Sequence, residues 1–166
     1  LIGARRSRLG DQVLVAARGG KAILFDESDA RVMGRTATGV KAIALGEGDE
    51  VVGMEVLQPD TMILTLSENG YGKRTPVSEY RVQRRGGQGI INIKTTARNG
   101  NVIGVLQVAE SDDLMLITDG GKVLRSPASG VSKLGRATQG VRVMNLSSGE
   151  KLVAVARLAE SALLIG

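Results

Sequence analysis

Cysteine and histidine are absent from the 166 residues of this chain, and only three residues are aromatic. Without cysteine the chain forms no disulfides, and without either residue it lacks the ligands of the usual zinc sites. No apolar run reaches the roughly 18 residues that a membrane-spanning helix requires, and the first residues do not form a signal peptide. A P-loop and a calcium loop are also missing. We therefore predict no membrane association, no metal, no cofactor and no catalytic residues in this chain.

The residues that are present favour an all-β fold. Because aromatic residues are so few, the core must come from valine, isoleucine, leucine and alanine. Valine-rich segments without long helical patterns favour strands, and the 23 glycines indicate many tight turns. The first residue is leucine rather than methionine, so we expect a piece of a longer protein.

The net charge of +5 is unevenly distributed along the chain. Between Glu79 and Glu110 there is no acidic residue, while acidic and basic residues roughly cancel elsewhere. The basic residues of this stretch equal the whole positive excess; they are Arg81, Arg84, Arg85, Lys94 and Arg98. A concentrated basic face on a balanced body is typical of proteins that bind nucleic acid.

One unit is repeated three times. The motif Arg-x-x-x-Gly followed by valine or isoleucine recurs at spacings of 50 and 51 residues, beginning at Arg35, Arg85 and Arg136. A turn followed by lysine also recurs, at Lys21, Lys73 and Lys122. Landmarks that keep step in three copies argue against a β-sandwich with accidental internal similarity.

Each copy is predicted to contain four short antiparallel strands, the first two joined by glycine-containing turns. In the first copy these are Val13–Ala17, Ala22–Phe25, Val40–Leu45 and Val51–Leu57. In the second they are Met62–Leu66, Lys73–Pro76, Ile90–Thr95 and Val102–Val108. In the third they are Leu114–Thr118, Val123–Arg125, Val141–Leu146 and Leu152–Leu158.

Four strands in a repeat of this length are typical of a propeller blade. We expect one propeller fragment over residues 1–166, with repeats at approximately 11–58, 60–109 and 112–160. Because closed propellers carry about 4–8 blades, three repeats predict an open half-ring, which association with a second chain can complete.

Several phrases resemble the C-terminal domain of the DNA gyrase A subunit, over at least residues 11–160. They are Glu68–Thr75 with Glu79-Tyr80, Gly46–Asp49 and Ile117–Gly121. Residues 83–89, Gln-Arg-Arg-Gly-Gly-Gln-Gly, are similar to the gyrase box of that family, whose usual form is Gln-Arg-Arg-Gly-Gly-Lys-Gly. The resemblance implies a β-pinwheel, a propeller variant in which neighbouring blades exchange strands.

The resemblance also implies a function. Domains of this family bind duplex DNA without sequence specificity around a basic rim and wrap it, which lets the ATP-dependent type IIA topoisomerase introduce negative supercoils. The implied partners are duplex DNA, the remainder of the gyrase A subunit and the gyrase B subunit, in the bacterial cytoplasm at the nucleoid. The alternatives are the corresponding domain of the topoisomerase IV A subunit and a propeller that serves protein–protein contacts.

The candidate DNA-binding residues form two groups. The first is the box-like segment, in which arginine forks and glycine N–H groups suit phosphate oxygens: Gln83, Arg84, Arg85, Gly86, Gly87, Gln88 and Gly89. Gln88 replaces the usual lysine, and the position in the middle repeat indicates an echo of a principal box upstream. For Arg85, the recurrence of the arginine at Arg35 and Arg136 leaves a second interpretation open, a structural role in which its side chain bonds loop carbonyls.

The second group contains cations that recur on the second strand of each repeat and would lie at successive points around a rim; these are Lys73, Arg74, Lys122 and Arg125, in step with Lys21. It also contains Arg81 and Lys94 of the stretch without acidic residues. Many phosphate contacts along a curved path offset the elastic cost of bending DNA. For any single lysine, ordinary surface charge is the competing interpretation. Tyr71 and Tyr80 are predicted to pack rather than to act in cleavage.

Overall fold

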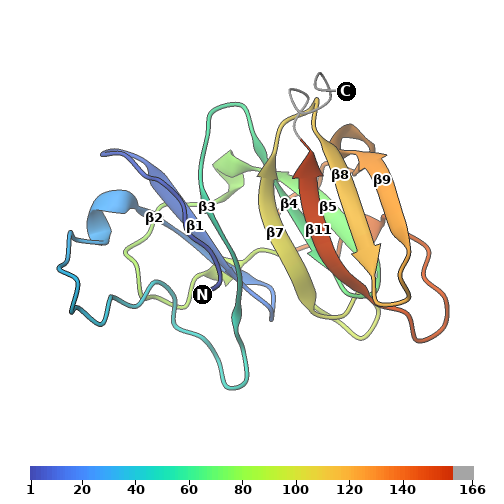
Figure 1. Cartoon of the computed structure of the whole chain (residues 1–166), viewed down its shortest axis with the longest axis horizontal. Helices are drawn as coiled ribbons and strands as arrows, with labels where there is room; N and C mark the ends of the chain where they lie inside the picture. The colour runs from blue at the N-terminus through green and yellow to red at the C-terminus, as the bar shows by residue number, and fades with distance from the viewer. Residues whose placement is uncertain (159–166) are drawn as a thin grey trace.

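A computed structural model of the chain describes residues 1–158 and contains three antiparallel sheets (Figure 1). The first sheet contains β1 (Gln12–Ala17), β2 (Lys21–Asp26), β3 (Val51–Val56) and β6 (Ile90–Ile91). The second contains β4 (Met62–Ser67), β5 (Tyr71–Pro76), β7 (Val102–Val108) and β10 (Val141–Arg142). The third contains β8 (Asp113–Thr118), β9 (Val123–Pro127) and β11 (Leu152–Leu158). Short 3-10 helices follow β2, β5 and β9: η1 (Glu27–Asp29), η2 (Val77–Glu79) and η3 (Ala128–Gly130).

The sheets exchange strands between neighbouring repeats. The order of the first sheet is β3-β1-β2-β6, although β6 belongs to the second repeat. The second sheet has the order β10-β5-β4-β7, and β10 comes from the third repeat. The predicted all-β architecture of three blade-like repeats is therefore confirmed, and the outermost strand of each complete blade is donated by the repeat that follows.

The predicted strand Val40–Leu45 is wrong, because no strand is assigned there. The corresponding strands of the other two repeats are shorter than predicted, and each pairs only with the second strand of the preceding repeat. The first repeat has no preceding sheet among residues 1–158, so its third segment has no strand to pair with. This segment instead packs Ile43 into the core, and the Ala44 N–H donates to Gly87 O at 2.8 Å.

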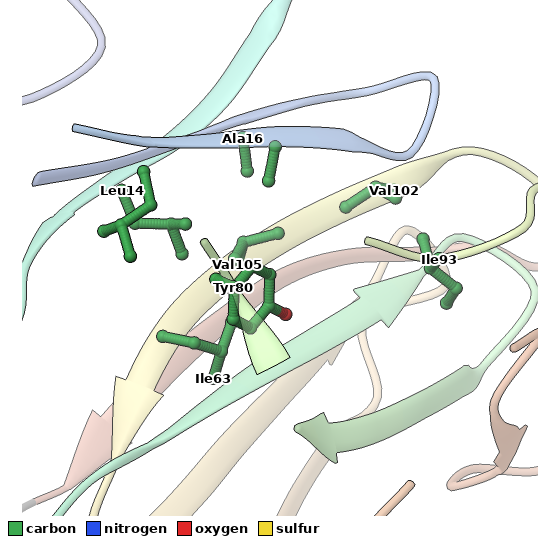
Figure 2. Packing of buried hydrophobic residues seen from close by; sticks show 9 residues of the cluster. Leu14, Ala16, Ile63, Tyr80, Ile93, Val102 and Val105 are labelled. Carbon is green, nitrogen blue, oxygen red and sulfur yellow. The ribbon is translucent and has the colours of Figure 1, made fainter. Parts of the chain in front are cut away.

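The core lies between the sheets, because side chains on alternate residues of a strand face opposite neighbours. Leu14 and Ala16 of β1 pack with Ile63 of β4 and Val105 of β7 (Figure 2). A second cluster joins the second and third sheets through Leu64, Leu66, Leu114 and Leu116, among others. Strands β3, β7 and β11 lie side by side, so the donated strands β6 and β10 form the outer edges of their sheets.

None of the helices in the described part of the chain is long and apolar enough to cross a membrane. The predicted end of the third repeat at residue 160 lies outside the described residues.

Candidate nucleic-acid interface

The box-like segment lies across the outer part of the first sheet rather than on its own. The Gln83 N–H donates to Leu24 O at 2.7 Å, and the Gly86 N–H donates to Ala42 O at 2.6 Å. These bonds tie the segment to the preceding repeat just before the chain enters β6. The exposed Gln88 lies between Gly87 and Gly89, two of the glycines whose N–H groups were predicted to face a phosphate.

The two adjacent arginines of the box do different things. Arg85 is half-buried, and its Nε donates to Asp29 O at 2.7 Å while Nη1 donates to Lys41 O at 3.1 Å. Arg84 is exposed, and within residues 1–158 its side chain makes no hydrogen bond or ion pair. Arg84 is therefore available to an external anion, whereas Arg85 is occupied by backbone carbonyls.

The contacts of Arg85 recur one repeat further along the chain. Arg136 donates from Nε to Glu79 O at 2.9 Å and from Nη1 to Ile91 O at 2.7 Å. Glu79 ends η2 as Asp29 ends η1, so the two arginines bond equivalent carbonyls of the repeat before them. No repeat precedes Arg35 among the described residues, so this exposed arginine has no equivalent carbonyls to bond. The recurring arginine thus connects one blade to the next.

Lys73 and Arg74 are buried, which corrects their predicted position on an exposed rim. The Lys73 ammonium donates to Asn92 O at 2.6 Å, Gly135 O at 2.7 Å and Thr138 Oγ1 at 3.1 Å. Burial, followed by the nearby Arg136, lowers the pKa of Lys73 to about 8. Lys73 therefore connects the second and third repeats from inside the structure.

The Arg74 guanidinium makes three contacts of its own. Its Nε donates to Val131 O at 2.7 Å, its Nη2 donates to Ser129 O at 3.1 Å, and its Nη1 pairs with Glu110 at 2.7 Å. The hydrogen bond from Arg74 holds the pKa of the Glu110 carboxyl below its usual range. Both predicted rim cations of β5 are thus used within the chain.

The physical reason for this correction is the register of the strands. Leu66 pairs with Gly72 in the second repeat, where Ala16 pairs with Ala22 in the first. Tyr71 is therefore the structural counterpart of Lys21, and Lys73 lies two residues further along its strand. Matching the lysines by their neighbouring glycines concealed this offset.

Lys122 and Arg125 are half-exposed but already paired with acids. Lys122 Nζ lies 3.1 Å from Glu150 Oε1, and Arg125 Nη2 lies 2.7 Å from Asp113 Oδ2. The acidic partners are more buried than the cations, and both pairs leave less net charge for an external phosphate.

Three predicted cations remain exposed and without a side-chain hydrogen bond or ion pair within residues 1–158: Arg81, Arg84 and Lys94. All three belong to the stretch without acidic residues. Arg81 and Arg84 precede β6, and Lys94 follows it, so they flank a donated outer strand. Among residues 1–158 there is no group of acidic side chains suited to a metal ion.

Two exposed cations, Arg98 and Arg142 of β10, were not among the predicted site residues. The sequence signal of Arg98 is its place in the stretch without acidic residues, and that of Arg142 is its place directly after the third copy of the repeated motif, where the second copy has Ile91. The predicted packing of Tyr71 and Tyr80 agrees with their burial at 5% exposure each.

Comparison with known proteins gives consistent matches. The profile of a family described as "DNA gyrase C-terminal domain, beta-propeller" matches residues 11–58, 61–109 and 112–159. The DNA gyrase A subunit of Klebsiella oxytoca is 46% identical over 160 residues, which is 96% of this chain and 18% of that protein. The chain thus spans less than a fifth of the length of such relatives.

Solved structures agree with the fold. The structure described as "Structure of DNA gyrase A C-terminal domain" superposes with a TM-score of 0.83 at 31% identity, covering 90% of this chain and 51% of that one. A C-terminal domain of DNA topoisomerase IV superposes with a TM-score of 0.84 at 22% identity, covering 90% of this chain and 47% of that one. The second likeness concerns the fold alone.

Proposed function

Because this chain belongs to the DNA gyrase C-terminal domain family, we propose that it binds duplex DNA along the outer edges of its blades and bends it. The observation that carries the proposal is the set of exposed, unpaired cations beside β6 within residues 1–158, namely Arg81, Arg84 and Lys94. Guanidinium and ammonium groups in this state neutralise phosphates and release condensed counterions.

The proposed binding is independent of base sequence. The helices of the described residues are 3-10 turns of three residues each, so none of them is long enough to read a groove. In the proposed complex, cations at the edges of successive blades contact phosphates along a curved path, and such contacts offset the cost of bending duplex DNA.

We propose that the bent DNA serves negative supercoiling in a whole gyrase, with the rest of the gyrase A subunit and the gyrase B subunit as partners. The chemistry of strand cleavage and ATP hydrolysis is assigned to those other parts. A role in gyrase is favoured over topoisomerase IV because the solved gyrase A C-terminal domain shares 31% identity with this chain, whereas the topoisomerase IV domain of the same fold shares 22%.

Salt dependence of binding tests this function. The affinity of the chain for a labelled duplex, measured by fluorescence anisotropy, is expected to fall linearly in log-log form with salt, with a slope of about −0.9 per phosphate neutralised. The same slope is expected for duplexes of unrelated sequence. Absence of binding at low salt, or an affinity that does not change with salt, would contradict the proposal.

Substitution of Arg84 tests whether this side chain contacts DNA without changing the stability of the fold. Arg84→Ala is expected to weaken binding several-fold with an unchanged melting temperature, and to reduce the salt slope by about one contact. Arg18→Ala is the matched control, because Arg18 is exposed and paired with Glu50 at 3.5 Å. Equal losses of affinity in both variants would show that total charge, rather than Arg84, determines binding.

A further inference from the structure

Two arginines from different repeats converge on the phenol of Tyr71. Arg98 Nε donates to the Tyr71 hydroxyl at 3.3 Å, and Arg142 Nη2 donates to the same oxygen at 3.0 Å. Their guanidinium carbons also lie over the ring, at 5.0 Å and 5.5 Å from its centre. The ring is buried, while both arginines are exposed. Tyr71 thus presents a pair of guanidinium groups at the surface.

The backbone that carries this pair is held by polar side chains. Asn99 is fully buried, and its Nδ2 donates to Lys94 O at 2.8 Å and to Gln139 O at 3.0 Å. Asn69 Nδ2 donates to Arg98 O at 3.1 Å. Arg142 lies on β10, where it pairs directly with Tyr71 of β5. The positions of both arginines are therefore largely fixed before any ligand arrives.

No carboxylate among residues 1–158 forms an ion pair with either arginine. Like charges held on one oxygen repel each other, and a bound anion relieves that repulsion. The hydrogen bond from Arg142, and to a smaller extent the one from Arg98, lowers the pKa of the Tyr71 hydroxyl, because both guanidinium groups stabilise its negatively charged form. Both terminal nitrogens of Arg98 lack a partner among the described residues, so the pair retains donors for phosphate oxygens.

The arrangement follows the repeat. In the first sheet, Lys21 of β2 pairs with Ile91 of β6, and in the second, Tyr71 of β5 pairs with Arg142 of β10. Each complete sheet therefore carries one cation in this outer pair of residues. In the first sheet it is Lys21 on β2, and in the second sheet it is Arg142 on the donated strand β10. At the second sheet, Gly135 takes the place that the exposed Arg84 has at the first sheet. A phosphate at the outer edge of the second sheet must therefore be bound by other cations.

We propose that Arg98 and Arg142, positioned by Tyr71, form a clamp for a backbone phosphate of duplex DNA at the outer edge of the second sheet. The clamp rests on the proposed DNA-binding function and extends the DNA path from Arg84 to the next blade. Tyr71 is a positioning residue, since its buried ring and hydroxyl hold the arginines and do not reach the phosphate.

The test measures duplex affinity against salt for Arg98→Gln/Arg142→Gln and for Tyr71→Phe, which keeps the ring and removes the shared acceptor. The double variant is expected to bind about 10-fold to 100-fold more weakly and to reduce the salt slope by about one to two contacts. Tyr71→Phe is expected to bind about 3-fold to 10-fold more weakly. Arg18→Gln/Arg157→Gln removes the same charge from ion-paired arginines outside the candidate site and is the matched control.

A double variant that binds like its control overturns the clamp, and if Arg84→Ala still weakens binding, DNA binding itself stands. A parent chain that shows no salt-dependent binding overturns both proposals together. Melting curves accompany each measurement. If Tyr71→Phe does not fold, the arginine double variant decides, because both of its residues are exposed. An unchanged salt slope in that variant assigns the cluster to packing and contradicts the clamp.

Discussion

At the scale of single residues, Lys73 carries a buried positive charge between two repeats. Its ammonium bonds Asn92 O in its own repeat and Gly135 O in the next. An unpaired buried charge is costly, but three oxygen acceptors around one ammonium replace its lost hydration. With a pKa of about 8, the group is still mostly protonated at neutral pH.

The lowered pKa of Lys73 predicts that the protein becomes more stable as the pH rises from about 8 toward 10.5, the ordinary value. In this window the folded chain has released a proton that the unfolded chain keeps, so unfolding takes up a proton and higher pH opposes it. Denaturant unfolding across this window measures the effect. Lys73→Met is expected to lose the extra slope, while Lys94→Met, which changes an exposed lysine, is expected to keep it. A slope shared by both variants would contradict the assignment.

Arg84 and Arg85 show how far the sequence alone can separate such roles. The recurrence of Arg85 at Arg136 left both DNA contact and a structural contact open, and in the structure both side chains bond carbonyls of the preceding repeat. Arg84 does not recur, since Gly34 and Gly135 occupy its place. The arginine pair on Tyr71 escaped sequence reasoning because it depends on a strand from one repeat entering the sheet of another.

At the scale of elements, the glycine of the repeated motif makes the strand exchange possible. Gly140 has a φ of 75° and lies so close to β5 that an added Cβ would be 2.8 Å from Gly72 O. Its counterpart Gly39 also has a positive φ, of 89°, but nothing lies within 4 Å. The first repeat has no preceding sheet to approach among the described residues, so of these two only Gly140 combines the backbone demand with the steric one.

Gly140→Ala is therefore expected to destabilise the protein by about 2–4 kcal/mol, and Gly39→Ala by only about 1 kcal/mol, the cost of a left-handed backbone with a side chain. Denaturant unfolding at fixed pH measures both. The difference between the two variants reports the contact between the donated strand and its host sheet. Equal losses would show that backbone conformation accounts for the whole effect.

The strands themselves were predictable to different degrees for a physical reason. Strands β1, β4 and β8 pair on both sides within their own repeats, so their apolar pattern fixes them locally. The third segments depend on another repeat for their partner. Val40–Leu45 has the composition of a strand but no sheet to join, whereas Ile90–Ile91 and Val141–Arg142 find one.

At the scale of the whole molecule, β9 has a strand partner on one side only among residues 1–158, so the third sheet ends there in an open edge, at the right of Figure 1. Val123 and Leu124 of this strand are 61% and 38% exposed, although the equivalent strand β5, whose outer edge pairs with β10, is almost wholly buried. In the first repeat, Val40–Leu45 is the segment without a strand partner among the described residues. The two ends are therefore complementary, and either neighbouring repeats of a longer protein or a second chain can join them.

This complementarity predicts that the chain associates head to tail at high concentration. An open apolar edge accepts a strand, and two half-rings of three blades give a number within the usual range for closed propellers, about 4–8. Sedimentation equilibrium is expected to show concentration-dependent association that Leu124→Lys weakens, because the added charge lies where a strand must pair. Ile91→Lys, which adds the same charge to a similarly exposed apolar residue on β6 of the first sheet, is expected to leave it unchanged. A chain that remains monomeric at every concentration, or equal effects of both substitutions, would show that β9 does not recruit the free segment of a second chain.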